Sequence, residues 1–188
     1  MTAISILFTA GGYHATPWGR HVNEGAVEWP PSPWRLMRAL IASWKMTMPE
    51  VSEQRMQRLI SALSSPPDFG LPPATVAHTR HYMPLYGTTA SKTMVLDAYV
   101  VLPRKEPVLV MWKEDLPPED ERLLGRLLAN LPYFGRAESW CQAGLADEGE
   151  PDCLWMGPGR VIPEECEPVR VLAPARGVTL EHLMVDTG

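Results

Sequence analysis

Residues 3–44, AISILFTAGGYHATPWGRHVNEGAVEWPPSPWRLMRALIASW, decide the fold because a long loop separates two different hydrophobic periods. Ile4, Ile6 and Phe8 alternate with small or polar residues, which is typical of a half-buried strand that the following glycine pair closes. The loop at residues 13–31 is unusually rich in His, Trp and Arg. Since long loops in compact domains often carry function, we expect a binding surface here.

A helix is predicted to begin where the loop ends. Ser32 is a suitable N-cap, and Pro33 suits the first helical position because its missing N–H has no partner there anyway. Apolar residues then follow at helical spacing, namely Trp34, Met37, Leu40, Ile41 and Trp44. A second helix is predicted at residues 52–64, before two prolines, and we expect the two helices to pack as a hairpin.

The period changes to two at residues 75–84, TVAHTRHYMP, which predicts a strand. Its two faces would carry His78, Arg80 and Tyr82 on one side and Thr79, His81 and Met83 on the other. Residues 86–92, YGTTASK, are predicted to be a mobile connection. β-Branched residues at 93–102 and 107–112 indicate further strand material, broken by prolines and expected to form a hairpin or meander.

Two more elements complete the predicted order. Residues 117–131 combine two prolines, three acids in the first turn and a leucine stripe, which indicates a helix, and residues 139–146 suit a short strand. The order is therefore strand, helical region, strands, helix and strand. This is the β-α-β-β-α-β order of an α+β ferredoxin-like domain with an open antiparallel sheet. A fold of this class does not by itself name a function.

Composition narrows the class of protein. The chain has 188 residues, of which 45% are hydrophobic, so it can bury one substantial core. No apolar run approaches the roughly 18 residues of a membrane span, and the start lacks the basic lead of a signal peptide. Three cysteines without paired spacing favour neither a disulfide framework nor structural zinc. We expect a soluble cytoplasmic protein.

The charge is divided unevenly along the chain. Residues 1–113 hold 11 Lys and Arg against 7 Asp and Glu, whereas residues 114–188 hold 6 against 15. Because a charged partner responds to the local potential, an anionic partner should meet the first part. The acidic remainder is either a solvated surface or the contact for a basic neighbour.

Cations and aromatic rings recur together, which is the combination that holds a nucleic-acid backbone and stacks unpaired bases. The candidate RNA-binding residues are His14, Trp18, Arg20, His21, Asn23, Arg35, Arg38, His78, Arg80, His81, Tyr82, Lys92 and Arg136. Ordinary packing is the competing interpretation. The tryptophans could seat the loop on the helix, Arg20 could pair with Glu24 or Glu28, and Arg136 could pair with Glu138.

No cofactor is expected, and no catalytic or metal-ligating residue is assigned. The sequence contains none of the glycine motifs GxGxxG, GxxxxGK[ST] and GxSxG. Nucleotide-driven and serine-hydrolase chemistry are therefore not indicated by their usual motifs. His78 and His81 could form half of a metal site, but they have no acidic third ligand nearby, and strand spacing points them to opposite faces.

Four segments together resemble a known family. They are residues 11–44, HTRHYMP at 78–84, KTMVLDAYVVL at 92–102 and YFGRAES at 133–139. They are similar to the CRISPR-associated RAMP protein of type I-G (formerly I-U) systems, a fusion of a Cas-five-like subunit with a Cas-six-like RNA endonuclease. The similarity covers the Cas-five-like domain, here residues 1–172. Residues 173–188 would be a tail or the start of the Cas-six-like domain.

The resemblance implies an RRM-like structural subunit of a Cascade complex in antiviral defence. Such a subunit caps the 5′ handle of the CRISPR RNA beside Cas-seven-like backbone subunits, with a Cas-eight-like large subunit in the same complex, and meets target DNA only through the complex. No membrane is involved. Residues 82–93 would form a thumb over the RNA. The processing nuclease of the family lies in its C-terminal part, so nuclease activity is not transferred to this chain.

Two alternatives remain open at this point. A metal-independent endoribonuclease would use a constellation such as His21, His81, Tyr82 and Lys92 as acid and base groups. A protein-interaction module would instead dock a basic neighbour on the acidic C-terminal region. Cleavage of repeat RNA in EDTA would favour the first alternative, and assembly with partners in the absence of RNA would favour the second.

Overall fold

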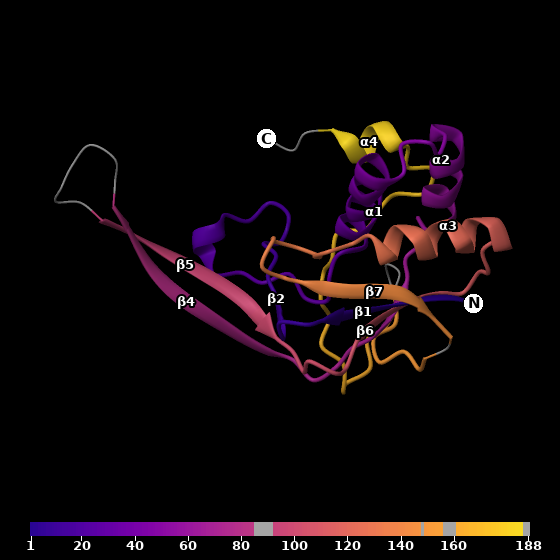
Figure 1. Ribbon diagram of the computed structural model, residues 1–188. Coiled ribbons are helices and arrows are strands. Elements are labelled where there is room, and N and C mark those ends of the chain that lie inside the picture. Colours follow the sequence, from indigo (N-terminus) through magenta and orange to yellow (C-terminus); the bar gives the residue numbers. More distant parts are fainter. Residues whose placement is uncertain (85–91, 148, 156–160, 186–188) are drawn as a thin grey trace.

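The computed structural model describes residues 1–84, 92–147, 149–155 and 161–185 (Figure 1). The longer strands and helices follow one another in the predicted order, with short elements between them. The elements are β1 (Thr2–Phe8), β2 (Gly12–Tyr13), the 3-10 helix η1 (Val22–Glu24), α1 (Pro33–Thr47), α2 (Glu53–Ala62), β3 (Asp68–Gly70), β4 (Thr75–Pro84), β5 (Lys92–Val101), β6 (Val108–Trp112), α3 (Pro118–Ala129), β7 (Cys141–Ala146) and α4 (Leu180–Met184).

The main sheet has the strand order β3-β6-β1-β7, and each neighbouring pair is antiparallel. β1 and β3 therefore run in the same direction with β6 between them, which is the split arrangement of a β-α-β-β-α-β fold. The expected α+β ferredoxin-like class is confirmed. The two helices α1 and α2 occupy the connection between β1 and β3, in the place of the first helix of the fold.

The core lies between this sheet and the helices that cover one of its faces (Figure 1). Ile4 and Ile6 of β1 are 0% exposed, and the leucine stripe of α3 is buried with them. The predicted alternation of β1 is thus confirmed. α1 begins as expected, because the Ser32 hydroxyl accepts a hydrogen bond from the Arg35 backbone N–H at 3.2 Å.

A long hairpin forms a second sheet and projects from the body (Figure 1). β4 pairs with β5 from Thr75↔Val101 to Pro84↔Lys92, whereas the two-residue strand β2 joins only at the base. The strand predicted at residues 75–84 is confirmed. Most of the connection predicted to be mobile and the centre of the expected thumb fall at residues 85–91, outside the described residues.

The expected pairing of residues 93–102 with 107–112 is wrong. β5 belongs to the hairpin and β6 to the main sheet, so the chain changes sheets between them. The physical reason lies in Leu102, whose backbone N–H donates to the Gly11 carbonyl at 2.9 Å and whose side chain is buried. This anchor ends the hairpin at the body and redirects the following residues into the core.

Sequence patterns did not predict β2, β3, η1 or α4. α4 lies within residues 173–188, which were expected to be a tail or the start of a further domain, and it packs against α1 and α2. Its Leu180 and Leu183 are buried in the same core as the main sheet. Within the described part of the chain, no helix has the length and apolar character needed to cross a membrane.

Candidate nucleic-acid interface

The β4–β5 hairpin displays polar and aromatic side chains on both faces. Because side chains alternate along a strand, Arg80 and Tyr82 lie on one face and His81 on the other. Tyr82 is 67% exposed, and His78 and Arg80 beside it are exposed as well. A strand with this much exposed aromatic and cationic surface gains little stability from packing. Its side chains are therefore available for a partner.

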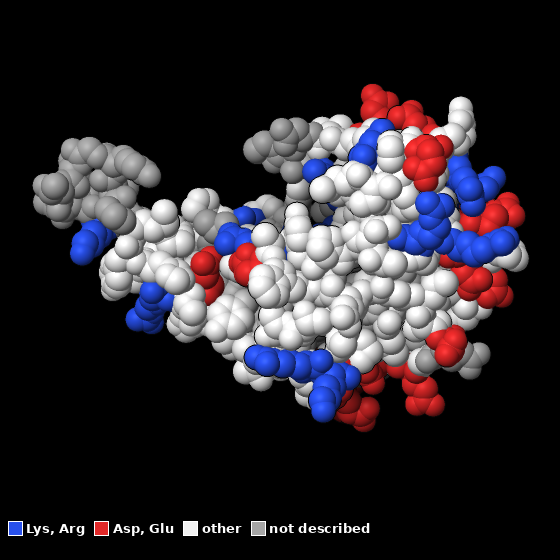
Figure 2. Space-filling model, in the orientation of Figure 1, with Lys and Arg blue, Asp and Glu red and all other residues white. Residues whose placement is uncertain are grey.

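Charge on the hairpin is mainly positive. Arg80 and Lys92 lie in its outer half, and Asp97 is the only acidic residue in the described parts of β4 and β5. Asp97 itself is engaged by Arg136 at 3.1 Å. Figure 2 shows Lys and Arg on the outer hairpin, whereas most of the Asp and Glu in view lie over the body. A polyanion would thus meet the hairpin first.

A group of polar side chains, here called the hairpin-base cluster, joins the hairpin to the body. It consists of His14, His81, Asp97, Arg136 and Glu138. His14 Nδ1 lies 2.5 Å from Glu138 Oε1, and its Nε2 lies 3.7 Å from Asp97 Oδ1. His81 Nε2 lies 3.8 Å from the other oxygen of Asp97. The cluster borders a hollow of about 250 Å³.

The turn at residues 133–139 holds the loop side of this cluster. Arg136 donates its backbone N–H to the His14 carbonyl at 2.8 Å, and the His14 N–H donates to the Ser139 hydroxyl at 2.8 Å. Gly135 has a φ of 101°, and a Cβ there would lie 2.5 Å from the His14 carbonyl oxygen. Glycine is required at this position for both reasons.

The loop before α1 brings further candidates beside the hairpin. η1 contacts β5, and Figure 1 shows this loop next to the ribbon. Within it, Trp18 is 55% exposed, and His21 caps η1 by accepting a hydrogen bond from the Asn23 N–H. Arg20 pairs with Glu24 at 3.1 Å, one of the two partners considered for it. Both members of that pair are exposed, so it is easily exchanged for another partner.

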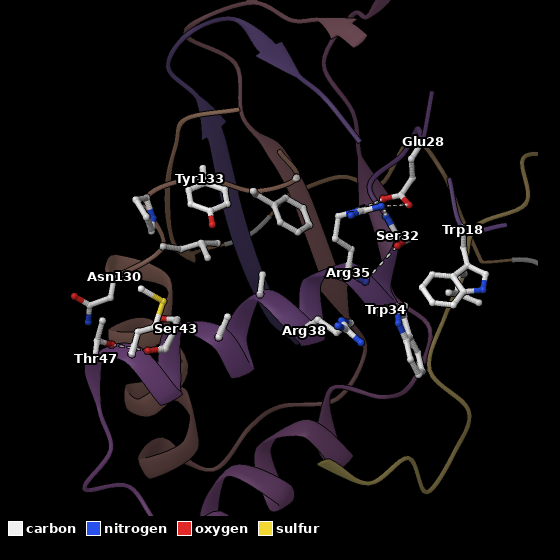
Figure 3. A pocket seen from close by; sticks show the side chains of 18 residues that line it. Trp18, Glu28, Ser32, Trp34, Arg35, Arg38, Ser43, Thr47, Asn130 and Tyr133 are labelled. Carbon is white, nitrogen blue, oxygen red and sulfur yellow. Dashed lines mark hydrogen bonds and ion pairs between the residues drawn. The ribbon is translucent and has the colours of Figure 1, made fainter. Parts of the chain in front are cut away.

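Arg35 is held by the protein itself. Its guanidinium donates to both oxygens of the buried Glu28, at 2.8 and 3.1 Å, and to the Thr16 carbonyl (Figure 3). Burial works against the charged form, yet the hydrogen bonds and charge of Glu28 raise the Arg35 pKa. Burial, followed by the charge of Glu28, raises the pKa of Tyr13, which therefore stays protonated and donates to Glu28 at 2.8 Å.

Arg38, one helical turn later, has different surroundings. Among the described residues its one recorded hydrogen bond is to a neutral acceptor, the Val185 carbonyl, at 3.0 Å. Its charge is therefore not balanced by a carboxylate in the described part of the chain. The two arginines looked equivalent in the sequence, but the structure separates them. Arg35 is held by the Glu28 carboxylate, whereas Arg38 has no carboxylate partner among the described residues.

The constellation considered for catalysis is spread out. His81 lies on the opposite face of β4 from Tyr82, and Tyr82 shares its face with Lys92 through the Pro84↔Lys92 register. Cys141 offers no ready nucleophile either, because burial raises the pKa of its thiol to about 12. The arrangement is suited to holding phosphates and bases, with histidines placed as hydrogen-bonding groups.

Sequence reasoning did not foresee the pairing of the acids at this interface, because it considered Glu28 for Arg20 and Glu138 for Arg136. The structure pairs Glu28 with Arg35 and Glu138 with His14, whereas Arg136 pairs with Asp97. Glu28, Asp97 and Glu138 each engage a predicted cation or histidine. Asp97 gave one usable signal, since a lone acid within a β-branched strand is unusual. Glu28 and Glu138 could be named as acids near candidate cations, but each stands in a polar loop, so the sequence did not show which cation it meets.

No family model matches the chain, and no curated protein matches it in sequence. Several solved structures have remote similarity in fold, including these two. One is Cas6 from Thermus thermophilus, with 15% identity, a TM-score of 0.37 and coverage of 77% of this chain and 53% of that chain. The other is a Cas6 product complex, with 16% identity, a TM-score of 0.36 and coverage of 77% and 50%. The chain thus spans about half the length of the structures it matches.

Proposed function

We propose that this protein is a non-catalytic RNA-binding subunit of a type I-G CRISPR Cascade complex. In that role it holds the 5′ handle of the CRISPR RNA beside the Cas-seven-like backbone. The hairpin supplies cations for phosphates and Tyr82 for stacking, and the loop around η1 supplies Trp18 and His21. Residues 82–93 act as the thumb over the RNA.

One observation carries this proposal. Each of the four segments that resemble the family contributes to the hairpin-base cluster, although they are far apart in the chain. His14 comes from the first segment, His81 from the second, Asp97 from the third, and Arg136 and Glu138 from the fourth. Segments that share a resemblance and meet at one place support a common function there, and the exposed hairpin next to them supports RNA as the ligand.

The proposal is tested by measuring binding of CRISPR RNA with its native handle and with a scrambled handle, with and without the Cas-seven-like partner. Fluorescence anisotropy at several salt concentrations gives affinity and salt dependence, and gels of the same samples report RNA integrity. We expect preference for the native handle and intact RNA. Binding without handle preference contradicts the capping role, and loss of intact RNA contradicts the non-catalytic one.

A paired substitution locates the contact on the hairpin. Arg80→Ala with Lys92→Ala should weaken binding and reduce the slope of log affinity against log salt by about 0.7 for each lost phosphate contact. The control is Arg122→Ala with Arg126→Ala on α3, which removes the same charge from exposed positions of the body. Equal effects of the two pairs would mean that only net charge matters and would contradict a hairpin contact.

A further inference from the structure

A groove runs along α1 on the side that faces the connection between α3 and β7. Its volume is about 650 Å³, within the range of sites for small ligands. Small side chains of α1, Ala39 and Ala42, lie along it, and residues 130–135 form the opposite wall (Figure 3). Between Trp34 and Thr47 the helix rises by about 20 Å, so the groove is long as well as narrow.

Aromatic rings and polar groups mark both ends of the groove. Trp18 and Trp34 lie at one end, and Tyr133, which is 44% exposed, lies at the other beside Asn130 (Figure 3). The Trp34 indole nitrogen is buried and has no hydrogen-bond partner among the described residues. A buried donor without a partner is costly, and a ligand that accepts a hydrogen bond there removes that cost.

The charge of the groove favours an anion. Glu28 is the only acid among the lining residues, and Arg35, Tyr13 and the Ser32 N–H already occupy it. Arg38 lines the same groove and donates only to a carbonyl in the described part of the chain. Exposed aromatic rings together with an arginine that no carboxylate of the described residues neutralises are typical of surfaces that bind single-stranded nucleic acid.

The groove also continues the candidate interface. Trp18 belongs to the loop that carries Arg20 and His21, and this loop contacts β5 of the hairpin. Figure 1 shows α1 and the hairpin on either side of that loop. The loop therefore links the hairpin to the groove on the protein.

From these observations we infer that the groove along α1 is a second RNA contact, which receives unpaired nucleotides that follow those held by the hairpin. A base stacks at Trp18 or Tyr133, a phosphate pairs with Arg38, and the Trp34 N–H donates to the RNA. This inference rests on the proposed RNA-binding function and extends it to a surface outside the hairpin.

Ala42→Glu tests the inference because it adds bulk and negative charge to the groove from an exposed helical position. Its control is Lys45→Glu, on the same helix but outside the groove, which changes the net charge by more. With the native handle RNA, Ala42→Glu should bind on the order of tenfold more weakly, and Lys45→Glu close to the wild type. Equal affinity of Ala42→Glu and the wild type overturns the inference.

RNA binding of the hairpin pair Arg80→Ala with Lys92→Ala, measured beside these variants, distinguishes the groove inference from the proposed function. If the hairpin variant binds RNA weakly and Ala42→Glu binds it normally, the groove inference is overturned and the proposed function stands. If Ala42→Glu binds RNA weakly and the hairpin variant binds it normally, the groove inference is supported and the hairpin contact is contradicted. Failure of the wild type to bind RNA overturns both.

A measurement on the unmodified protein guards against misfolded variants. RNA carrying 4-thiouridine is irradiated in complex with the wild type, and crosslinked peptides are identified by mass spectrometry. Crosslinks at Trp34 or Tyr133 support the inference, and crosslinks confined to the hairpin and the loop around η1 overturn it. Trp34→Phe keeps an aromatic ring but removes the indole N–H, and should bind about threefold more weakly.

Discussion

β1 and β4 have similar sequence patterns. Both are rich in β-forming residues, and their side chains alternate between two faces, yet one strand is buried and the other is exposed. β1 is central in the main sheet and its Ile4 is 0% exposed, whereas Val76 of β4 is 63% exposed. The difference follows from what covers each strand. Helices cover the main sheet, while the outer part of the hairpin has two strands and a largely exposed surface (Figure 1).

This contrast shows that the side chains of the main sheet pack in the core, whereas those of the outer hairpin do not. A two-stranded ribbon is marginally stable by itself, so the hairpin depends on its base for order. The hairpin-base cluster and the turn around Gly135 provide that connection. The body therefore determines stability, the hairpin presents side chains, and the base couples the two. Three pairs of substitutions test this division, from the largest expected effect to the smallest.

The first prediction compares a covered strand with an exposed one. Ile4→Ala should lower the free energy of unfolding by about 2–5 kcal/mol, because it leaves a cavity in a core that cannot fully relax. Val76→Ala, which removes two carbons from the hairpin surface, should change it by less than about 0.5 kcal/mol. Urea denaturation followed by circular dichroism measures both. Similar losses would show that the hairpin is packed as tightly as the body.

The second prediction separates the two arginines of α1. Arg35→Ala leaves the Glu28 carboxylate buried without its cation and should destabilise the fold by about 3 kcal/mol. Arg38→Ala removes a bond to one carbonyl and should leave stability nearly unchanged. Thermal unfolding gives the comparison. If Arg38→Ala is the more destabilising of the two, the division between a structural and an available arginine is wrong.

The third prediction concerns the base of the hairpin. Gly135→Ala should cost about 1–3 kcal/mol, since the residue has a positive φ and its Cβ would collide with the His14 carbonyl. Gly19→Ala is the matched control, with a φ of 74° and nothing within 4 Å of the added Cβ. The difference in stability between the two variants isolates the collision. A larger effect at Gly19 would contradict it.

Much of the fold could be predicted from local pattern. The strand at Ile4–Phe8, the helix that begins at Ser32 and the leucine stripe of α3 all follow from periodicity and capping, which are properties of neighbouring residues. The pairing of β5 could not be predicted this way, because a hydrogen bond from Leu102 to Gly11 joins residues distant in the chain. α4 was missed because five residues are too few for a clear helical period.

The candidate site divides in the same manner. Residue types and their exposure on a strand were foreseeable, so the exposed faces with Arg80 and Tyr82 correspond to the expected alternation. The ion-pair partners of the candidate residues could not be foreseen. Arg35 and Arg38 are chemically identical and lie one turn apart, and only the packed position of Glu28 distinguishes them. That the described residues bind RNA remains a prediction to be tested.

By itself the sequence determined the class of fold, the order of its longer elements and the positive character of its first part, because these depend on periodicity and composition. Only the tertiary structure decided which charges are compensated, which strands share a sheet and where the groove along α1 lies. The reason is physical. Electrostatic compensation and cavities depend on distances of a few ångströms between residues such as His14 and Glu138, which are 124 positions apart in the chain.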